Sequence, residues 1–118
     1  MKWRDLLPKD SEVILSSSGT FVLDDSKKSQ LGMLVLTQDK LYILLNKGFV
    51  KQLLWMYAAI PLSRLSNIQI VSNIVRLLDF NYLVAEQVKH VSFVSLDAEV
   101  KHILERIEYV SDNPRESP

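Results

Sequence analysis

The sequence contains no cysteine, and this absence removes several classes of protein. A chain without thiols forms no disulfide, has no cysteine nucleophile and cannot hold zinc through cysteine ligands. Such a composition is typical of a reducing compartment. Glycine is also scarce: with only three glycines, the chain has no glycine-rich loop of the kind that cradles phosphate groups.

The chain also lacks an excess of charge and a long hydrophobic run. Its 14 basic residues balance its 14 acidic ones, so attraction to an anionic surface must come from a local patch, and we expect no nucleic-acid partner. The longest apolar run, "LLWMYAAI" at 53–60, is far shorter than the roughly 20 residues that cross a bilayer. The N-terminus lacks the apolar segment of a signal peptide. We therefore expect a cytoplasmic protein whose contact with a membrane would be peripheral.

The length of 118 residues fits one domain. We expect this domain to span residues 1–112, followed by a polar tail at 113–118. A chain of this size buries roughly two-thirds of its unfolded surface, which is enough for a core without disulfides.

The most informative stretch is "LGMLVLTQDKLYILLN" at 31–46, in which two apolar runs flank a short polar break. The break and the β-branched residues favour a β-hairpin over one long helix. Both strands are apolar on both faces, so we expect other parts of the chain to cover both faces.

Further strands are indicated on either side of this hairpin. "LLDFNYLV" at 77–84 has the clearest alternation, with one face made of Leu78, Phe80, Tyr82 and Val84. "DDSKKSQ" at 24–30 is polar throughout and is expected to be a loop. The remaining strands are expected at 12–23 (bent or bulged at Gly19, or split there into two), 53–62, 68–71 and 88–95.

The two ends of the chain have helical spacing instead. Trp3, Leu6 and Leu7 suit one helical turn. Near the C-terminus we expect an amphipathic helix from about 97 to 111, capped by Ser95 or Asp97. The predicted fold class is therefore mainly β: a curled, seven-stranded antiparallel sheet, or partly open barrel, with one end plugged by the C-terminal helix.

"GMLVLTQDKLYIL" at 32–44, followed by "IPLSRLSNIQI" at 60–70, resembles the pleckstrin-homology-like (PH-like) superfamily, and is most similar to GRAM domains and bacterial PH-like domains. The turn departs from the family's pattern, with Gln38 and Lys40 in place of the usual Asn and Arg. The resemblance implies a PH-like fold and a role in binding lipids, peptides or partner domains. The residues that carry it are Gly32, Leu36, Thr37, Lys40, Leu41, Ile60, Pro61, Leu62, Leu65 and Ile68.

Two segments are candidate sites for anionic lipid headgroups. The resemblance implies that basic residues near the first hairpin loop bind phosphate, which here points to Lys27 and Lys28, although Asp24 and Asp25 beside them oppose their field.

The second segment, at 46–55, combines Lys47 and Lys51 with apolar side chains, a mixture typical of a membrane interface. The same apolar residues could instead contact another protein or pack in the core. They are Phe49, Leu53, Leu54 and Trp55.

No set of residues indicates catalysis, a metal site or a cofactor. His90 and His102 are the only histidines, and neither has the further ligands that a metal needs. The serines at 16–18 lack the spacing of a nucleophile elbow. We therefore expect a non-enzymatic module that docks on membrane lipid headgroups. The alternative is a protein-interaction or self-assembly domain that uses the apolar surface at 49–57 or a sheet edge.

Overall fold

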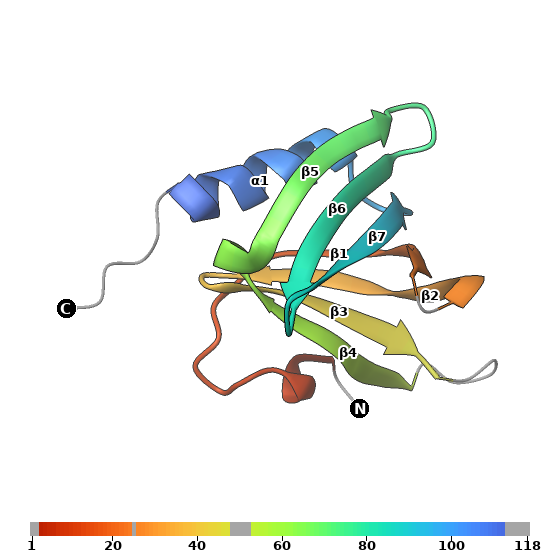
Figure 1. Cartoon of the computed structure of the whole chain (residues 1–118). Helices are drawn as coiled ribbons and strands as arrows, with labels where there is room; N and C mark the ends of the chain where they lie inside the picture. The colour runs from red at the N-terminus through yellow and green to blue at the C-terminus, as the bar shows by residue number, and fades with distance from the viewer. Residues whose placement is uncertain (1–2, 25, 48–52, 113–118) are drawn as a thin grey trace.

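The computed structural model describes residues 3–24, 26–47 and 53–112 (Figure 1). In this part of the chain, seven antiparallel strands form one sheet in the order β4-β3-β2-β1-β7-β6-β5, and one α-helix follows them. The predicted fold class is confirmed. The elements are η1 (Trp3–Leu6), β1 (Val13–Leu23), β2 (Ser26–Thr37), β3 (Lys40–Asn46), β4 (Leu54–Pro61), η2 (Leu62–Arg64), β5 (Leu65–Ser72), β6 (Leu77–Val84), β7 (Gln87–Ser95) and α1 (Val100–Asp112).

The sheet curls so that its two edges approach each other. β4 and β5 form opposite edges of the sheet, yet only the short helix η2 separates them in the sequence. A flat sheet could not place its two edges within reach of so short a connection. In Figure 1, β5, β6 and β7 cross over the layer formed by β1 to β4. The result is a partly open barrel with its core between the two crossing layers.

The β2–β3 hairpin is covered on both faces, as its sequence requires. Its inner face packs into the main core, where Phe21 and Phe93 are fully buried. Its outer face supplies Val35 and Leu44 to a second cluster, which the N-terminal segment covers through Leu7. The predicted helical turn is confirmed as η1, which lies over this outer face.

One expectation about the first hairpin is wrong, and of the two alternatives for residues 12–23 the split strand is excluded. Residues 24–30 do not form a loop, because β2 begins at Ser26 and pairs back along β1. Pairing satisfies the backbone groups, while polar side chains such as Lys28 remain exposed. β1 is not split at Gly19 either: it is one strand, and its register shifts lie near its two ends.

Gly19 and Gly32 face each other across β1 and β2. A Cβ atom at Gly32 would overlap the carbonyl oxygen of Leu44, and one at Gly19 would overlap the Phe93 ring and the carbonyl oxygen of Val94. Neither glycine has a positive φ. Both are therefore required by the close approach of neighbouring strands and not by an unusual backbone angle.

α1 begins later than predicted, at Val100 instead of near residue 97. It packs against β5, β6 and β1, and so covers core that the curled sheet would leave open. No helix among the described residues is both long and apolar enough to cross a bilayer. The buried residues of α1 are Val100, Ile103, Ile107 and Val110.

The expectation that Ser95 or Asp97 caps this helix is wrong, because both side chains instead tie the approach to α1 onto β1. Asp97 Oδ1 accepts a hydrogen bond from the Ser17 hydroxyl at 2.8 Å, and Oδ2 accepts one from the Ser18 backbone N–H at 3.2 Å. Since Ser17 gives its one hydrogen to the carboxylate, Ser95 must be the donor in the 2.9 Å contact between the two hydroxyls. Ser95 Oγ accepts the Ala98 N–H at 2.9 Å. The network satisfies two buried hydroxyls.

We expect Gly32→Ala to lower the free energy of unfolding by about 3 kcal/mol, because the added methyl group would overlap the backbone of Leu44. Urea denaturation monitored by fluorescence measures this change. Ser29→Ala, at an exposed position of the same strand, is the matched control and should change stability by less than about 0.5 kcal/mol. Wild-type stability in Gly32→Ala would contradict the close packing.

We expect Asp97→Ala to lower the free energy of unfolding by about 1–3 kcal/mol, because it leaves the buried Ser17 hydroxyl without its acceptor. In a double-mutant cycle with Ser17→Ala, the two losses should be less than additive. Asp10→Ala, at an exposed surface carboxylate, serves as the control. Fully additive losses would show that the two side chains do not act together.

Candidate functional site

The structure describes part of the predicted headgroup site. Lys28 is exposed near the start of β2, and Lys47 is exposed just after β3. Because these strands are antiparallel neighbours, both lysines lie at the same end of the sheet. The side chain of Lys27 and the whole of Phe49 and Lys51 lie outside the described residues.

A carboxylate is fixed at this same end. Asp24, directly after β1, accepts the backbone N–H of His90 through Oδ2 at 2.6 Å, which joins the end of β1 to β7. A negative charge held beside the start of β2 opposes the attraction of Lys28 for a phosphate group. The charges at this end therefore work against each other.

The apolar residues predicted beside these lysines separate onto two faces of β4. Leu54 is half-buried and packs against the outer cluster. Trp55 pairs with Leu45, an inner-core residue, so its side chain lies on the inner face, where it is 38% exposed at the rim. Leu53, just before β4, is 53% exposed. The Trp55 side chain thus points inward, but it lies at the mouth of the barrel and not in the core.

A second aromatic residue, Tyr57, lies beside Trp55 at this rim, next to a β-bulge. The register of β3 and β4 shifts between Ile43 and Leu44, which leaves Tyr57 as the extra residue of β4. Tyr57 packs against the main core, and its ring meets Trp55 edge-on with the ring centres 5.8 Å apart. Residues two positions apart on a strand share a face, so the two aromatic rings are neighbours at this rim.

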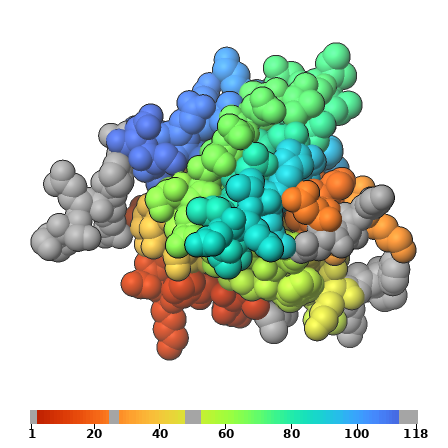
Figure 2. All heavy atoms as spheres, in the orientation of Figure 1, coloured from red at the N-terminus to blue at the C-terminus, as the bar shows by residue number. Residues whose placement is uncertain are grey.

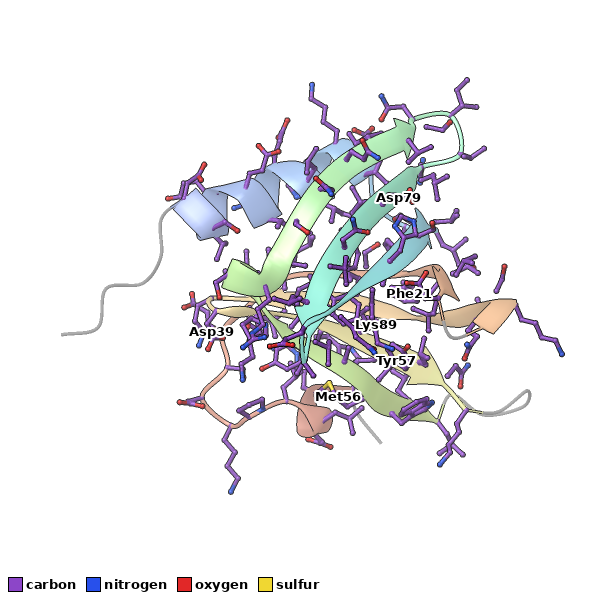
Figure 3. All side chains as sticks on the ribbon, in the orientation of Figure 1. Phe21, Asp39, Met56, Tyr57, Asp79 and Lys89 are labelled. Atoms are coloured by element: carbon purple, nitrogen blue, oxygen red, sulfur yellow. The ribbon has the colours of Figure 1, made fainter. Side chains whose placement is uncertain are left out.

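A groove of about 380 Å³ lies between β4 and the β6–β7 hairpin. We call it the seam groove, because β4 is one edge of the curled sheet. Figure 2 shows the hairpin (teal) next to β4 (light green), and Figure 3 labels Tyr57 and Lys89 close together at this place. Its lining residues are Tyr57, Ala58, Ala59, Ile60, Pro61, Tyr82, Leu83, Val84 and Lys89.

The lining of the seam groove is mostly apolar and includes one charged side chain, Lys89. Ala58 and Ala59 leave room above the strand because their side chains are small. Pro61 is the last residue of β4, an edge strand, where a proline is tolerated. Such a groove can take apolar side chains.

The far wall of the seam groove was not predicted. The alternation of β6 places Val84 on the buried face of the strand, but the Val84 side chain is 43% exposed. The neighbouring Leu83 is 40% exposed. The hairpin continues past the body of the molecule through a two-residue turn at Ala85 and Glu86, both with positive φ. Alternation in the sequence shows on which face of a strand a side chain lies. It does not show whether the core extends as far as that side chain, so the sequence contained no signal for this wall.

A polar cluster surrounds His90 on the outer face of β6 and β7. Its Nδ1 lies 2.8 Å from Asn81 Oδ1, while its Nε2 lies 3.3 Å from both Asp79 Oδ2 and Ser92 Oγ. In a hydrolytic triad the acid and the hydroxyl contact opposite ring nitrogens, whereas here they share one. The arrangement is that of a hydrogen-bonded surface histidine. The described residues contain no group of three or more His, Cys, Asp or Glu side chains that could hold a metal ion.

No family model and no curated protein sequence matches the chain. Solved structures do match. The DH/PH domains of PDZ-RhoGEF, in complex with activated RhoA, are 17% identical with a TM-score of 0.68, over 87% of this chain and 30% of that one. The Vav1 exchange factor is 10% identical with a TM-score of 0.64, over 90% and 27%.

The hSac2 domain of the human phosphoinositide phosphatase Sac2 is 14% identical with a TM-score of 0.68, over 93% of this chain and 76% of that one. The chain thus spans less than a third of the two exchange-factor chains and most of the hSac2 domain. At such low identities the likeness concerns the fold alone. Seven antiparallel strands in one curled sheet, closed by a C-terminal helix, together with these matches identify the fold of this chain as PH-like.

Proposed function

We propose that the chain is a non-catalytic recognition domain whose seam groove binds a short extended segment of a partner protein. The observation that supports this most directly is the groove itself, which combines apolar walls, small side chains at Ala58 and Ala59, and the edge strand β4. Sheet edges bind extended peptides by adding a strand: main-chain hydrogen bonds supply affinity, and adjacent pockets select side chains. The apolar walls would favour apolar side chains in the bound segment.

Headgroup binding has weaker support. Recognition of a phosphorylated headgroup requires several cations that converge on one point. The seam groove has one, and the end of the sheet that carries Lys28 and Lys47 also holds the fixed carboxylate of Asp24. The net charge of zero adds no general attraction to an anionic surface.

Docking on a membrane surface is the second candidate, and one observation favours it. Lys47 is exposed, and so are Leu53 and Trp55 at the start of the neighbouring strand. Apolar side chains beside a lysine suit the boundary between headgroups and acyl chains. We further propose that residues 1–112 form a single cytoplasmic domain of GRAM-like type.

Selection from a phage-displayed library of random peptides tests the groove. We expect enriched peptides to share an apolar residue and to bind the purified chain. Ala59→Arg, which places a long charged side chain in the groove, should weaken their binding by about tenfold or more. Ser66→Arg, exposed on β5 outside the groove, should leave their affinity unchanged.

Two outcomes would overturn the groove proposal. One is enrichment of peptides that bind wild type and Ala59→Arg equally well. The other is a failed selection together with sedimentation on phosphatidylserine-containing vesicles that Lys47→Glu or Trp55→Asp abolishes, which would establish the second candidate instead.

A further inference from the structure

The tip of the β5–β6 hairpin exposes aliphatic side chains that the fold does not use. Val71 is 52% exposed, Val75 is 53% exposed, and Ile74 at the apex is 95% exposed. Tight turns ordinarily consist of Gly, Asn, Asp, Ser or Pro, because these residues form local hydrogen bonds or accept unusual backbone angles. Adjacent Ile and Val residues do neither, so neither turn formation nor core packing accounts for them.

The backbone holds this tip in a defined shape. The Arg76 N–H donates to the carbonyl of Asn73 at 3.4 Å, and the Val75 N–H donates to the Ser72 hydroxyl at 3.4 Å. The carbonyl of Arg76 accepts the Ser95 N–H at 3.1 Å, which fastens the tip to the end of β7. The exposure of Ile74 and Val75 is therefore built into the turn.

A hollow beside the tip is lined by two positive side chains and one negative side chain. The tip and the start of α1 together line a shallow hollow of about 400 Å³, which contains two exposed cations, Arg76 and Lys101, and one carboxylate, Glu99. In Figures 1 and 2 the tip projects at the upper right, beyond the body of the molecule. The remaining lining residues are Asn73, Ile74 and Val100.

We propose that this tip inserts into the interfacial region of a lipid bilayer that contains anionic lipids. Ile74 and Val75 enter the boundary between headgroups and acyl chains, while Arg76 and Lys101 contact the headgroups. The site is separate from the seam groove and from the β3–β4 end, since it lies at the opposite end of β6 from the β6–β7 turn. It therefore does not depend on what the groove binds.

The shape of the tip favours a bilayer over a protein partner. A stable protein interface buries about 800 Å² on each side, which requires a broad and complementary surface. A single convex hairpin turn presents only a few side chains and cannot bury that area. A bilayer needs no complementary shape, because a few aliphatic side chains and neighbouring cations suffice for reversible binding.

Sedimentation with vesicles tests the proposal. We expect the wild-type chain to bind phosphatidylcholine vesicles that contain phosphatidylserine more tightly than pure phosphatidylcholine vesicles, with affinity that falls as salt rises. The double variant Ile74→Asn, Val75→Asn should bind the phosphatidylserine-containing vesicles at least about tenfold more weakly than the wild-type chain does. Val88→Asn is the matched control: Val88 is 65% exposed on the β6–β7 hairpin and should behave as wild type.

A fluorescent label locates the contact directly. Because the chain has no cysteine, Ile74→Cys and Val88→Cys each provide one unique attachment site for the environment-sensitive dye NBD. We expect the emission at position 74 to shift to the blue on phosphatidylserine-containing vesicles and that at position 88 to stay unchanged.

Three results would overturn the proposal. The first is a wild-type chain that sediments with neither kind of vesicle. The second is wild-type vesicle binding by the tip variant, or a blue shift at position 88 only, which would place the membrane contact away from the tip. The third is a dimer in solution that Ile74→Asn dissociates, which would make a second copy of the chain the occupant. The first and third of these results do not bear on peptide binding in the groove.

Discussion

A β-hairpin that is apolar on both faces must be covered on both, and this requirement of β2 and β3 shapes the rest of the structure. The inner face demands a second layer, which β5 to β7 and α1 supply. The outer face demands a cover of its own, and the N-terminal segment lies across it with Leu7 buried. A sheet with solvent on one side would need no such cover. The short N-terminal helix therefore contributes to the stability of the fold.

At two points, neighbouring strands of the sheet approach each other more closely than a side chain would allow. Gly19 and Gly32 occupy those points, and a methyl group at either would overlap neighbouring backbone. The Asp97 carboxylate then fastens the segment before α1 to β1, so the helix is held at its start as well as along its buried face. Close strand contact and a buried polar network thus act together on β1.

The same closure leaves a seam. β4 and β5 are joined by η2 at one end. In the described sheet β4 pairs only with β3, so its other edge has no strand partner. The β6–β7 hairpin overhangs that edge, and the space between them is the seam groove. The β5–β6 tip lies at the other end of β6. A domain bound to a bilayer through this tip would keep the groove available to a protein, so the two surfaces are compatible in one molecule.

Much of the architecture is readable from local pattern. The strands of the 31–46 hairpin follow from its two apolar runs, and α1 follows from the spacing of its buried residues. The start of β2 was not readable, because polarity at 24–30 indicates exposed side chains and says nothing about backbone pairing. The position of Val84 was not readable either, because alternation does not show where the core ends.

The candidate sites depend even more on the closed sheet. The segment that contains Lys47 and Trp55 was predicted from its mixture of basic and apolar residues. The seam groove could not be predicted in this way, because it lies between β4 and a hairpin that is far away in the sequence. Likewise, Asp97 bonds to Ser17, 80 positions earlier, instead of capping the adjacent helix. Periodicity and turn chemistry act between near neighbours, and so the sequence by itself determined the strands, the helix and the need to cover both hairpin faces. Which surfaces meet, and which side chains remain exposed, was decided only when the curled sheet brought its distant segments together.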